Sequence, residues 1–170
     1  SFESCWVKNP EEWAACTANQ LGPYYDIFAL RHPLWSPNDC FKSQYFLEQS
    51  GLTKYRSLII AVYDRMLDID NNGQWIEVES SFGGLAVYNV DFLKRARYSG
   101  IDDEGLDVCE HVFLNNRIRE NKGSIFINSN LINANYTEHT RYLIFGGKLF
   151  LWLKVKIITY LNHRANSVKN

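Results

Sequence analysis

The stretch Ser80-Ser81-Phe82-Gly83-Gly84-Leu85-Ala86-Val87-Tyr88 is the most informative part of the chain. It predicts a short apolar strand that ends at a double glycine, after which the chain resumes as a second strand. Two adjacent glycines lack Cβ atoms and tolerate positive φ angles, so a ligand or another backbone segment can approach closely. Further along, Glu110 and His111 place a carboxylate next to an imidazole. We expect this combination to carry chemistry.

Around this stretch, predicted strands alternate with predicted helices, which indicates an α/β layered domain. Apolar or alternating segments predict strands at 24–31, 75–79 and 124–127. Apolar residues at three- and four-residue spacing predict helices, most clearly at 53–67. Ser36-Pro37-Asn38-Asp39 predicts a turn that caps a helix ending at about Gln49. Further helices are expected at 90–97, 106–118 and 142–162. Residues 11–20 fit either a short helix or the start of a strand.

Size and composition predict one soluble globular domain. The chain has 170 residues, of which 46% are hydrophobic and 22% are charged, which is ordinary for such a domain. Its four cysteines, Cys5, Cys16, Cys40 and Cys109, show no CxxC spacing. This argues against a zinc site and fits buried thiols in a reducing cytoplasm, while leaving disulfides open.

The charge is unevenly distributed. Net charge is −1, yet residues 139–170 contain six basic residues and no acidic one, so the preceding part is acidic. This asymmetry indicates an anionic partner such as a membrane surface or phosphates, or simply a solvated helix face. The segment 149–158 interleaves lysines with apolar residues, as interfacial helices do. We therefore expect peripheral membrane contact through residues 141–164, no membrane span and no nucleic-acid partner.

Residues 68–79 match the pattern of an EF-hand calcium loop. Asp68, Asp70, Asn72 and Gly73 are followed by Glu79 at the required spacing. The expected outgoing helix is replaced by a predicted strand, which favours a simple turn from helix to strand. A calcium- or carbohydrate-binding module centred on residues 68–79 is the alternative function.

Four blocks resemble, in order and rough spacing, a family of GT-A-type glycosyltransferases of surface-polysaccharide synthesis and related mannosyltransferases. The likeness covers roughly residues 14–134. The blocks are Tyr24-Tyr25-Asp26-Ile27-Phe28-Ala29-Leu30-Arg31, then Ser80 to Tyr88 as quoted above, then Cys109-Glu110-His111-Val112, then Ile127-Asn128-Ser129-Asn130-Leu131-Ile132-Asn133.

The resemblance implies roles for individual residues. Phe82, Gly83 and Gly84 would form the glycine loop that frames the donor sugar and the acceptor. Glu110 would be the catalytic carboxylate, with His111 where many members have a second carboxylate. His139 would be a late histidine that completes a metal site.

Two further residues are candidates for binding donor or acceptor. Asp26 lies among apolar neighbours, so its carboxylate needs a partner and is either structurally hydrogen-bonded or part of the site. Trp75 offers an aromatic face on which a pyranose ring can stack. Glu110 fits a general base whose pKa is tuned by burial and by His111.

The resemblance also implies cofactors and partners. Such an enzyme moves a sugar from a nucleotide-diphosphate donor to a glycan or lipid-linked acceptor with a divalent metal, Mn²⁺ or Mg²⁺.

Only 23 residues precede Tyr24, too few for the nucleotide-binding half of such an enzyme. We therefore expect residues 1–140 to be an incomplete GT-A domain, a Rossmann-like layered mixed sheet with flanking helices. Residues 141–170 would form a basic apolar C-terminal helix, with the metal bound mainly by residues outside the chain. The expected location is the cytoplasm, at the inner face of the membrane.

Overall fold

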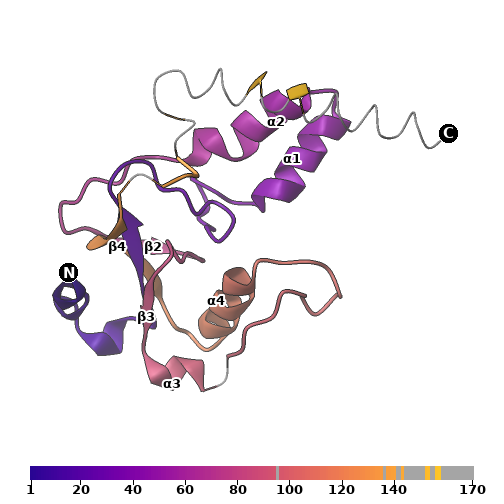
Figure 1. Ribbon diagram of the computed structural model, residues 1–170. Helices are drawn as coiled ribbons and strands as arrows, with labels where there is room; N and C mark the ends of the chain where they lie inside the picture. The colour runs from indigo at the N-terminus through magenta and orange to yellow at the C-terminus, as the bar shows by residue number, and fades with distance from the viewer. Residues whose placement is uncertain (95, 136, 141–142, 144–151, 154–155, 158–170) are drawn as a thin grey trace.

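The computed structural model describes residues 1–94, 96–135, 137–140, 143, 152–153 and 156–157. A mixed four-stranded sheet forms the centre of the fold (Figure 1), with strand order β2-β4-β1-β3. The strands are β1 (Ala15–Gln20), β2 (Trp75–Val78), β3 (Ala86–Tyr88) and β4 (Ile125–Ala134). The helices are α1 (Cys40–Gln49), α2 (Lys54–Ala61), α3 (Val90–Leu93) and α4 (Glu110–Glu120). The prediction of a mixed α/β fold is confirmed.

The two central strands run parallel, and each carries an antiparallel strand on its outer edge. β1 pairs with β4 from Ala15 opposite Ile125 onward, while β3 lies antiparallel to β1 and β2 antiparallel to β4. Residues 15–20 of β1 are all buried. The open choice at residues 11–20 is thereby decided: a short 3-10 turn, η2 (Pro10–Glu12), leads into the buried strand.

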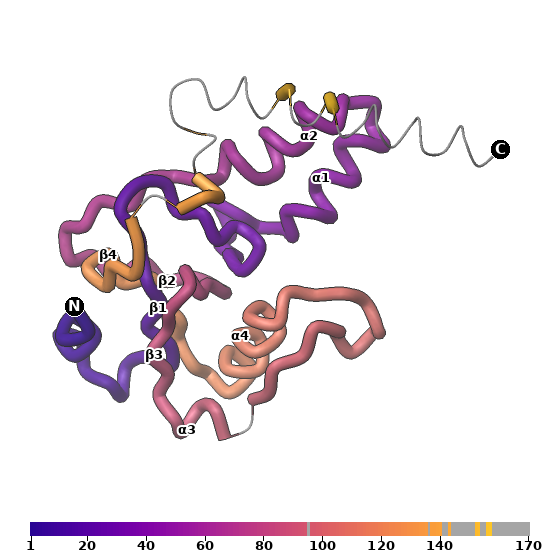
Figure 2. Tube along the Cα trace, viewed as in Figure 1, coloured from indigo at the N-terminus to yellow at the C-terminus, as the bar shows by residue number. Residues whose placement is uncertain are grey.

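Different parts of the chain cover the two faces of the sheet (Figure 2). On one face, Leu114 and Ile118 of α4 pack into the main core with Ile125 and Ile127 of β4. The N-terminal segment, including the 3-10 turn η1 (Phe2–Trp6), covers the other face. There Cys5 and Trp13 are buried in a second cluster with strand residues such as Cys16. Side chains that alternate along one strand therefore enter two separate cores.

Residues 24–31 were predicted to be a strand, and this is wrong. The segment is an irregular loop in which the Leu30 amide donates to the Asp26 carbonyl at 3.2 Å. β1 occupies the position next to β4, and residues 24–31 lie outside the four-stranded sheet.

Residues 53–67 were predicted to be a single helix, but α2 ends at Ala61 and a 3-10 turn, η3 (Tyr63–Arg65), follows. Tertiary hydrogen bonds account for the early end. The Arg65 carbonyl accepts from the Trp35 indole at 2.6 Å, and the Arg65 guanidinium donates to the Asn38 carbonyl at 2.9 Å. These contacts hold the chain out of a regular helix.

Other predicted bounds shift in the same way. α3 ends at Leu93 rather than Arg97, and α4 begins at Glu110 rather than near Leu106. The strand predicted at 124–127 extends as β4 to Ala134, because Asn128 and Ser129 are buried with hydrogen-bond partners. α1 begins close to the predicted turn, where the Asp39 carboxylate accepts from the amides of Phe41 and Lys42.

Most of the predicted C-terminal helix lies outside the described residues. Trp152, Leu153, Lys156 and Ile157 are helical and exposed, and the Lys156 ammonium lies 4.4 Å from the centre of the Trp152 ring. Among the described residues, none of the helices has the length and apolar character needed to cross a membrane.

Candidate functional site

A half-buried carboxylate connects two of the predicted blocks. The Asp26 carboxylate accepts a hydrogen bond from the Gly83 amide at 2.9 Å, and a second one from the Ala29 amide. Burial raises the pKa of Asp26, while the two amides and nearby His111 hold that pKa down. The expectation that Asp26 needs a partner is confirmed, because the glycine loop supplies that partner.

His111 lies between two aromatic rings beside this carboxylate. Its imidazole stacks on Phe82 with ring centres 3.7 Å apart, and Tyr98 meets it edge-on at 5.4 Å. Its Nε2 is 3.8 Å from a Glu110 oxygen, and its buried Nδ1 has no hydrogen-bond partner among the described residues. Burial lowers the pKa of His111, against the opposing pull of Glu110 and Asp26.

Glu110 lies at the solvent-exposed start of helix α4, next to His111. Glu110 is the first residue of the helix, and 54% of its side chain is exposed, against 15% for His111. A carboxylate in the first turn is stabilised by the positive end of the helix dipole. An accessible carboxylate beside a half-buried imidazole is suited to accepting a proton from a bound molecule.

A buried polar network fixes the glycine loop to α4. The Asn115 side-chain amide donates to the Ser80 hydroxyl at 2.9 Å and to the Ser81 carbonyl at 3.0 Å. The Ser81 hydroxyl in turn lies 2.6 Å from the Thr17 hydroxyl of β1. Asn115 is one turn beyond His111, so these bonds set the position of α4 relative to Phe82.

The double glycine is required by protein contacts. Gly83 and Gly84 have φ angles of +66° and +80°, which disfavour any side chain. A Cβ on Gly83 would lie 2.2 Å from the Ala18 carbonyl oxygen of β1. A Cβ on Gly84 would lie 2.6 Å from both the Tyr25 hydroxyl and the Asn133 amide nitrogen. Protein groups therefore make the close approach at the side of each glycine where a Cβ would stand.

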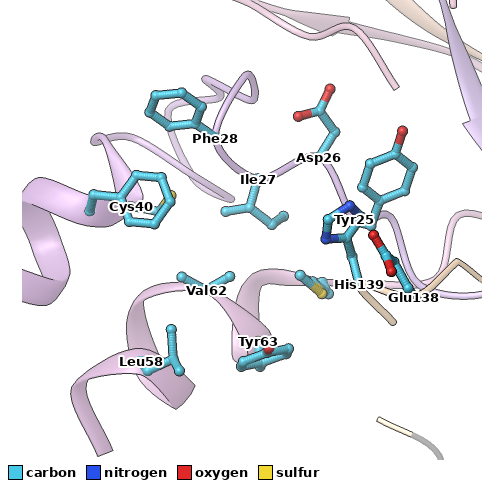
Figure 3. A pocket seen from close by; sticks show the side chains of 12 residues that line it. Tyr25, Asp26, Ile27, Phe28, Cys40, Leu58, Val62, Tyr63, Glu138 and His139 are labelled. Atoms are coloured by element: carbon cyan, nitrogen blue, oxygen red, sulfur yellow. The ribbon is translucent and has the colours of Figure 1, made fainter. Parts of the chain in front are cut away.

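A cavity of about 550 Å³ opens next to Asp26, between the 25–28 loop, α1 and α2 (Figure 3). The stacked rings of Tyr25 and His139, with centres 5.4 Å apart, form one wall beside Glu138. The remaining wall is largely apolar and consists of Ile27, Phe28, Cys40, Phe41, Leu58, Val62, Tyr63 and Met66. The cavity thus has an acidic, hydroxyl-bearing end and an apolar end.

Two predicted site residues lie apart from the Asp26–Glu110–His111 group. Trp75 packs between Trp13 and Phe126, with ring centres 6.0 and 5.7 Å away, in the cluster on the opposite face of the sheet. His139 lines the cavity, but its ring stacks on Tyr25. No group of three or more His, Cys, Asp or Glu side chains able to hold a metal occurs in the part of the chain that the structure describes.

The segment that matches an EF-hand loop leads straight into β2. Asn72 uses its side-chain oxygen to accept from the Gln74 amide at 3.1 Å. Glu79, the expected last ligand, pairs with Arg119 at 3.4 Å. This arrangement agrees with the predicted turn from helix to strand.

Sequence reasoning missed three residues that shape the site. Tyr25 and Glu138 line the cavity, and Asn115 anchors the glycine loop. Tyr25 stood within a block assigned to a strand, and nothing in the local sequence separates it from a core tyrosine. Asn115 had one signal, because an amide on the apolar face of a helix requires a buried partner.

Comparisons with known proteins found no relatives. No protein-family model matches the chain, and no curated protein or solved structure matches it at a significant level.

The position of His111 leads to a testable pH dependence. We expect its imidazole to titrate below the ordinary pKa of 6.5, because burial disfavours the charged ring. Glu110→Gln and Asp26→Asn should each lower that pKa further, since both carboxylates favour the imidazolium. Imidazole carbon and nitrogen shifts followed by NMR measure this directly.

The contributions of His111 and Asp26 to the free energy of unfolding depend on pH in opposite directions. For His111 the folded-state pKa is depressed, so its contribution is present above pH 6.5 and is lost as pH falls through the folded-state pKa. For Asp26 the folded-state pKa is raised, so its contribution is present below pH 3.8 and is lost as pH rises through the folded-state pKa.

The NMR titration has a clear negative outcome. If Glu110→Gln and Asp26→Asn both leave the His111 pKa unchanged, the two carboxylates do not lie close to the imidazole in solution.

Proposed function

We propose that the chain is the acceptor side of a GT-A-like glycosyltransferase, which moves a sugar from a nucleotide-diphosphate donor to a glycan or lipid-linked acceptor. One observation carries the proposal: three sequence blocks that resemble this family meet at one place. Asp26 from the first block binds Gly83 from the second, and His111 from the third stacks on Phe82. The Asp26 carboxylate is also close enough to His111 and Glu110 for both to affect its pKa, so residues far apart in sequence lie beside Glu110.

In this proposal Glu110 is the general base. Its exposed carboxylate takes the proton from an acceptor hydroxyl, and the freed oxygen forms a bond to the anomeric carbon of the donor. The bond from that carbon to the diphosphate breaks, and the diphosphate leaves with the electron pair. Asp26 is less suited to this step, because the Gly83 and Ala29 amides already use its carboxylate. Asp26 instead positions the glycine loop.

The cavity beside Asp26 is the proposed acceptor site. Its end near Tyr25, Asp26 and Glu138 carries hydroxyl and carboxylate groups that can bond sugar hydroxyls. The two carboxylates there make this end a poor place for a diphosphate. An adjoining cavity of about 600 Å³ shares Phe28 and Phe41 with the first and extends along Tyr45 and Phe46 of α1. Its surface is mostly apolar, although Asp39, Lys42 and Asp107 also line it. An acceptor with a sugar head and an apolar tail would use both.

The donor, the metal and the membrane are wider parts of the proposal. A divalent ion, Mn²⁺ or Mg²⁺, held mainly by residues outside the chain, would neutralise the departing diphosphate. The proposed proton transfer itself uses side chains alone. A cytoplasmic location at the inner membrane face would suit a lipid-linked acceptor. The exposed Trp152, Leu153 and Ile157 are compatible with peripheral contact there.

The experiment that tests the proposal is a transfer assay on the intact protein that carries this sequence. A panel of nucleotide-diphosphate sugars is supplied with Mn²⁺ and with either alkyl glycosides or free oligosaccharides as acceptors. We expect acceptor-dependent release of nucleoside diphosphate together with a glycosylated product, and a preference for the alkyl glycosides. Absence of product across the panel, with His111 resonances unmoved by every acceptor, would reject the proposal.

A further inference from the structure

We infer that Cys5 and Cys16 are a cross-linking site, at which oxidation forms a disulfide between the N-terminal 3-10 turn η1 and strand β1. The two Sγ atoms lie 3.2 Å apart, and both residues are completely buried. This inference concerns the face of the sheet opposite α4 and does not rest on the proposed function.

The surroundings hold the two thiols together. The Asn128 side-chain amide donates to the Ser4 hydroxyl at 2.9 Å and contacts the Cys16 sulfur at 3.5 Å. It therefore ties the residue before Cys5 to the strand that carries Cys16. The N-terminal amino group adds a bond to the Asn130 carbonyl at 3.3 Å. The cross-link therefore joins two residues whose side chains β4 already holds together.

The other two cysteines provide internal controls. Cys40 begins α1 in the main core, and Cys109 precedes α4 in a cluster with Ala29 and Val112. Both are buried free thiols, so burial alone does not distinguish the pair. Only the contact between Cys5 and Cys16 predicts a specific bond.

The reaction balances with a low-molecular-weight disulfide such as oxidised glutathione as the oxidant. One cysteine loses its proton and attacks the oxidant, forming a mixed disulfide and releasing one glutathione thiolate. The second cysteine, deprotonated in turn, attacks the mixed disulfide, closing the Cys5–Cys16 bond and releasing the second glutathione. The protein loses two electrons and two protons, and one glutathione disulfide becomes two thiols.

Burial sets the conditions for this reaction. It raises the pKa of the Cys16 thiol far above its ordinary value, and Cys5 raises it further, so little thiolate exists in the closed state. The oxidant therefore reaches the two thiols when η1 moves away from β1. While η1 stays in place, Cys5 and Cys16 resist bulky alkylating reagents. Once formed, the bond ties η1 to β1. The Ala18 carbonyl of the same strand packs against Gly83.

The test is thiol counting on the full chain. After equilibration with oxidised glutathione, the chain is denatured, alkylated and weighed. Before alkylation we expect a mass lower by two hydrogens than that of the reduced chain. After alkylation we expect two alkylated thiols instead of four, and one cross-linked peptide containing Cys5 and Cys16. The double variant Cys40→Ser/Cys109→Ser should keep the cross-link, whereas Cys5→Ser should lose it and show three alkylated thiols.

Thermal unfolding provides the second measurement. A short closed loop restricts the unfolded chain, so the oxidised form should melt about 5–10 °C above the reduced form. The Cys5→Ser variant should show no such dependence on reductant. Four alkylated thiols at oxidising equilibrium, or a cross-link through Cys40 or Cys109, would overturn the inference. Peptide mapping of the unmutated chain distinguishes these outcomes even if a variant fails to fold.

Discussion

Gly83→Ala is expected to destabilise the fold by about 3–5 kcal/mol, because the substitution combines an unfavourable backbone conformation with a collision. The Gly83 φ angle of +66° is costly for alanine, and the new Cβ would stand 2.2 Å from the Ala18 carbonyl oxygen. That oxygen belongs to the backbone of a buried central strand, so it cannot rotate away as a side chain would. Against a typical total of about 5–15 kcal/mol, such a loss removes much of the stability of the domain.

Gly105→Ala is the matched control for this prediction. Gly105 also has a positive φ, +80°, but its Cβ would point into open space with nothing within 4 Å. Its substitution should therefore cost only about 1 kcal/mol, the backbone contribution alone. Urea unfolding followed by tryptophan fluorescence compares the two midpoints at unchanged slope. Equal losses for the two variants would mean that the Gly83 contact with β1 contributes nothing.

This comparison also changes the meaning of the double glycine. The sequence alone predicted a close approach at Gly83 and Gly84, and the φ angles and contacts confirm it. The identity of the approaching groups was beyond sequence reasoning, because Ala18, Tyr25 and Asn133 come from three distant segments. The proposed donor sugar can still contact Phe82 and the backbone of the loop, but it does not explain why both residues are glycine.

Predictions succeeded where local pattern and tertiary packing agree. The turn at 68–74, the strand at Trp75–Val78 and the helix that carries Glu110 and His111 follow from spacing and turn chemistry. The strand predicted at 24–31 failed because an apolar run cannot reveal that β1 already occupies the sheet. β1 itself, with Thr17, Asn19 and Gln20 all buried, looks too polar for a central strand. Its side chains are stabilised there by long-range hydrogen bonds, such as Asn19 to the Ile69 carbonyl at 3.0 Å.

The same distinction applies to the site. Asp26, Phe82, Gly83, Glu110 and His111 were selected from separate blocks, and they meet in space. Trp75 was selected for its ring alone, and it lies in the opposite core. An aromatic residue on a predicted strand gives no sign of which sheet face it occupies until the neighbouring strands are known. The carboxylate and the imidazole were better guides, because groups that are costly to bury need specific partners.

Glu110→Gln is expected to lower the transfer rate of the intact protein by about 10²–10⁴-fold, the usual contribution of a general base. Glutamine keeps the shape of the side chain and its capacity to accept hydrogen bonds but cannot take the acceptor proton. Because Glu110 is half exposed and its one close contact of ion-pair type among the described residues is with His111 at 3.8 Å, the fold should be unaffected. The loss should appear in kcat, with KM for the acceptor little changed.

Glu104→Gln separates this effect from a general loss of negative charge, since Glu104 is exposed on the loop before α4. That variant should retain full transfer, and both variants should unfold at the same urea concentration as the parent. If Glu110→Gln retains full turnover, Glu110 is not the base. A loss that appears only in acceptor KM would make Glu110 a binding residue, and the proton would have to leave by another group. His111 would be the first alternative, because burial lowers its pKa and keeps its imidazole neutral, and therefore able to accept a proton, at neutral pH.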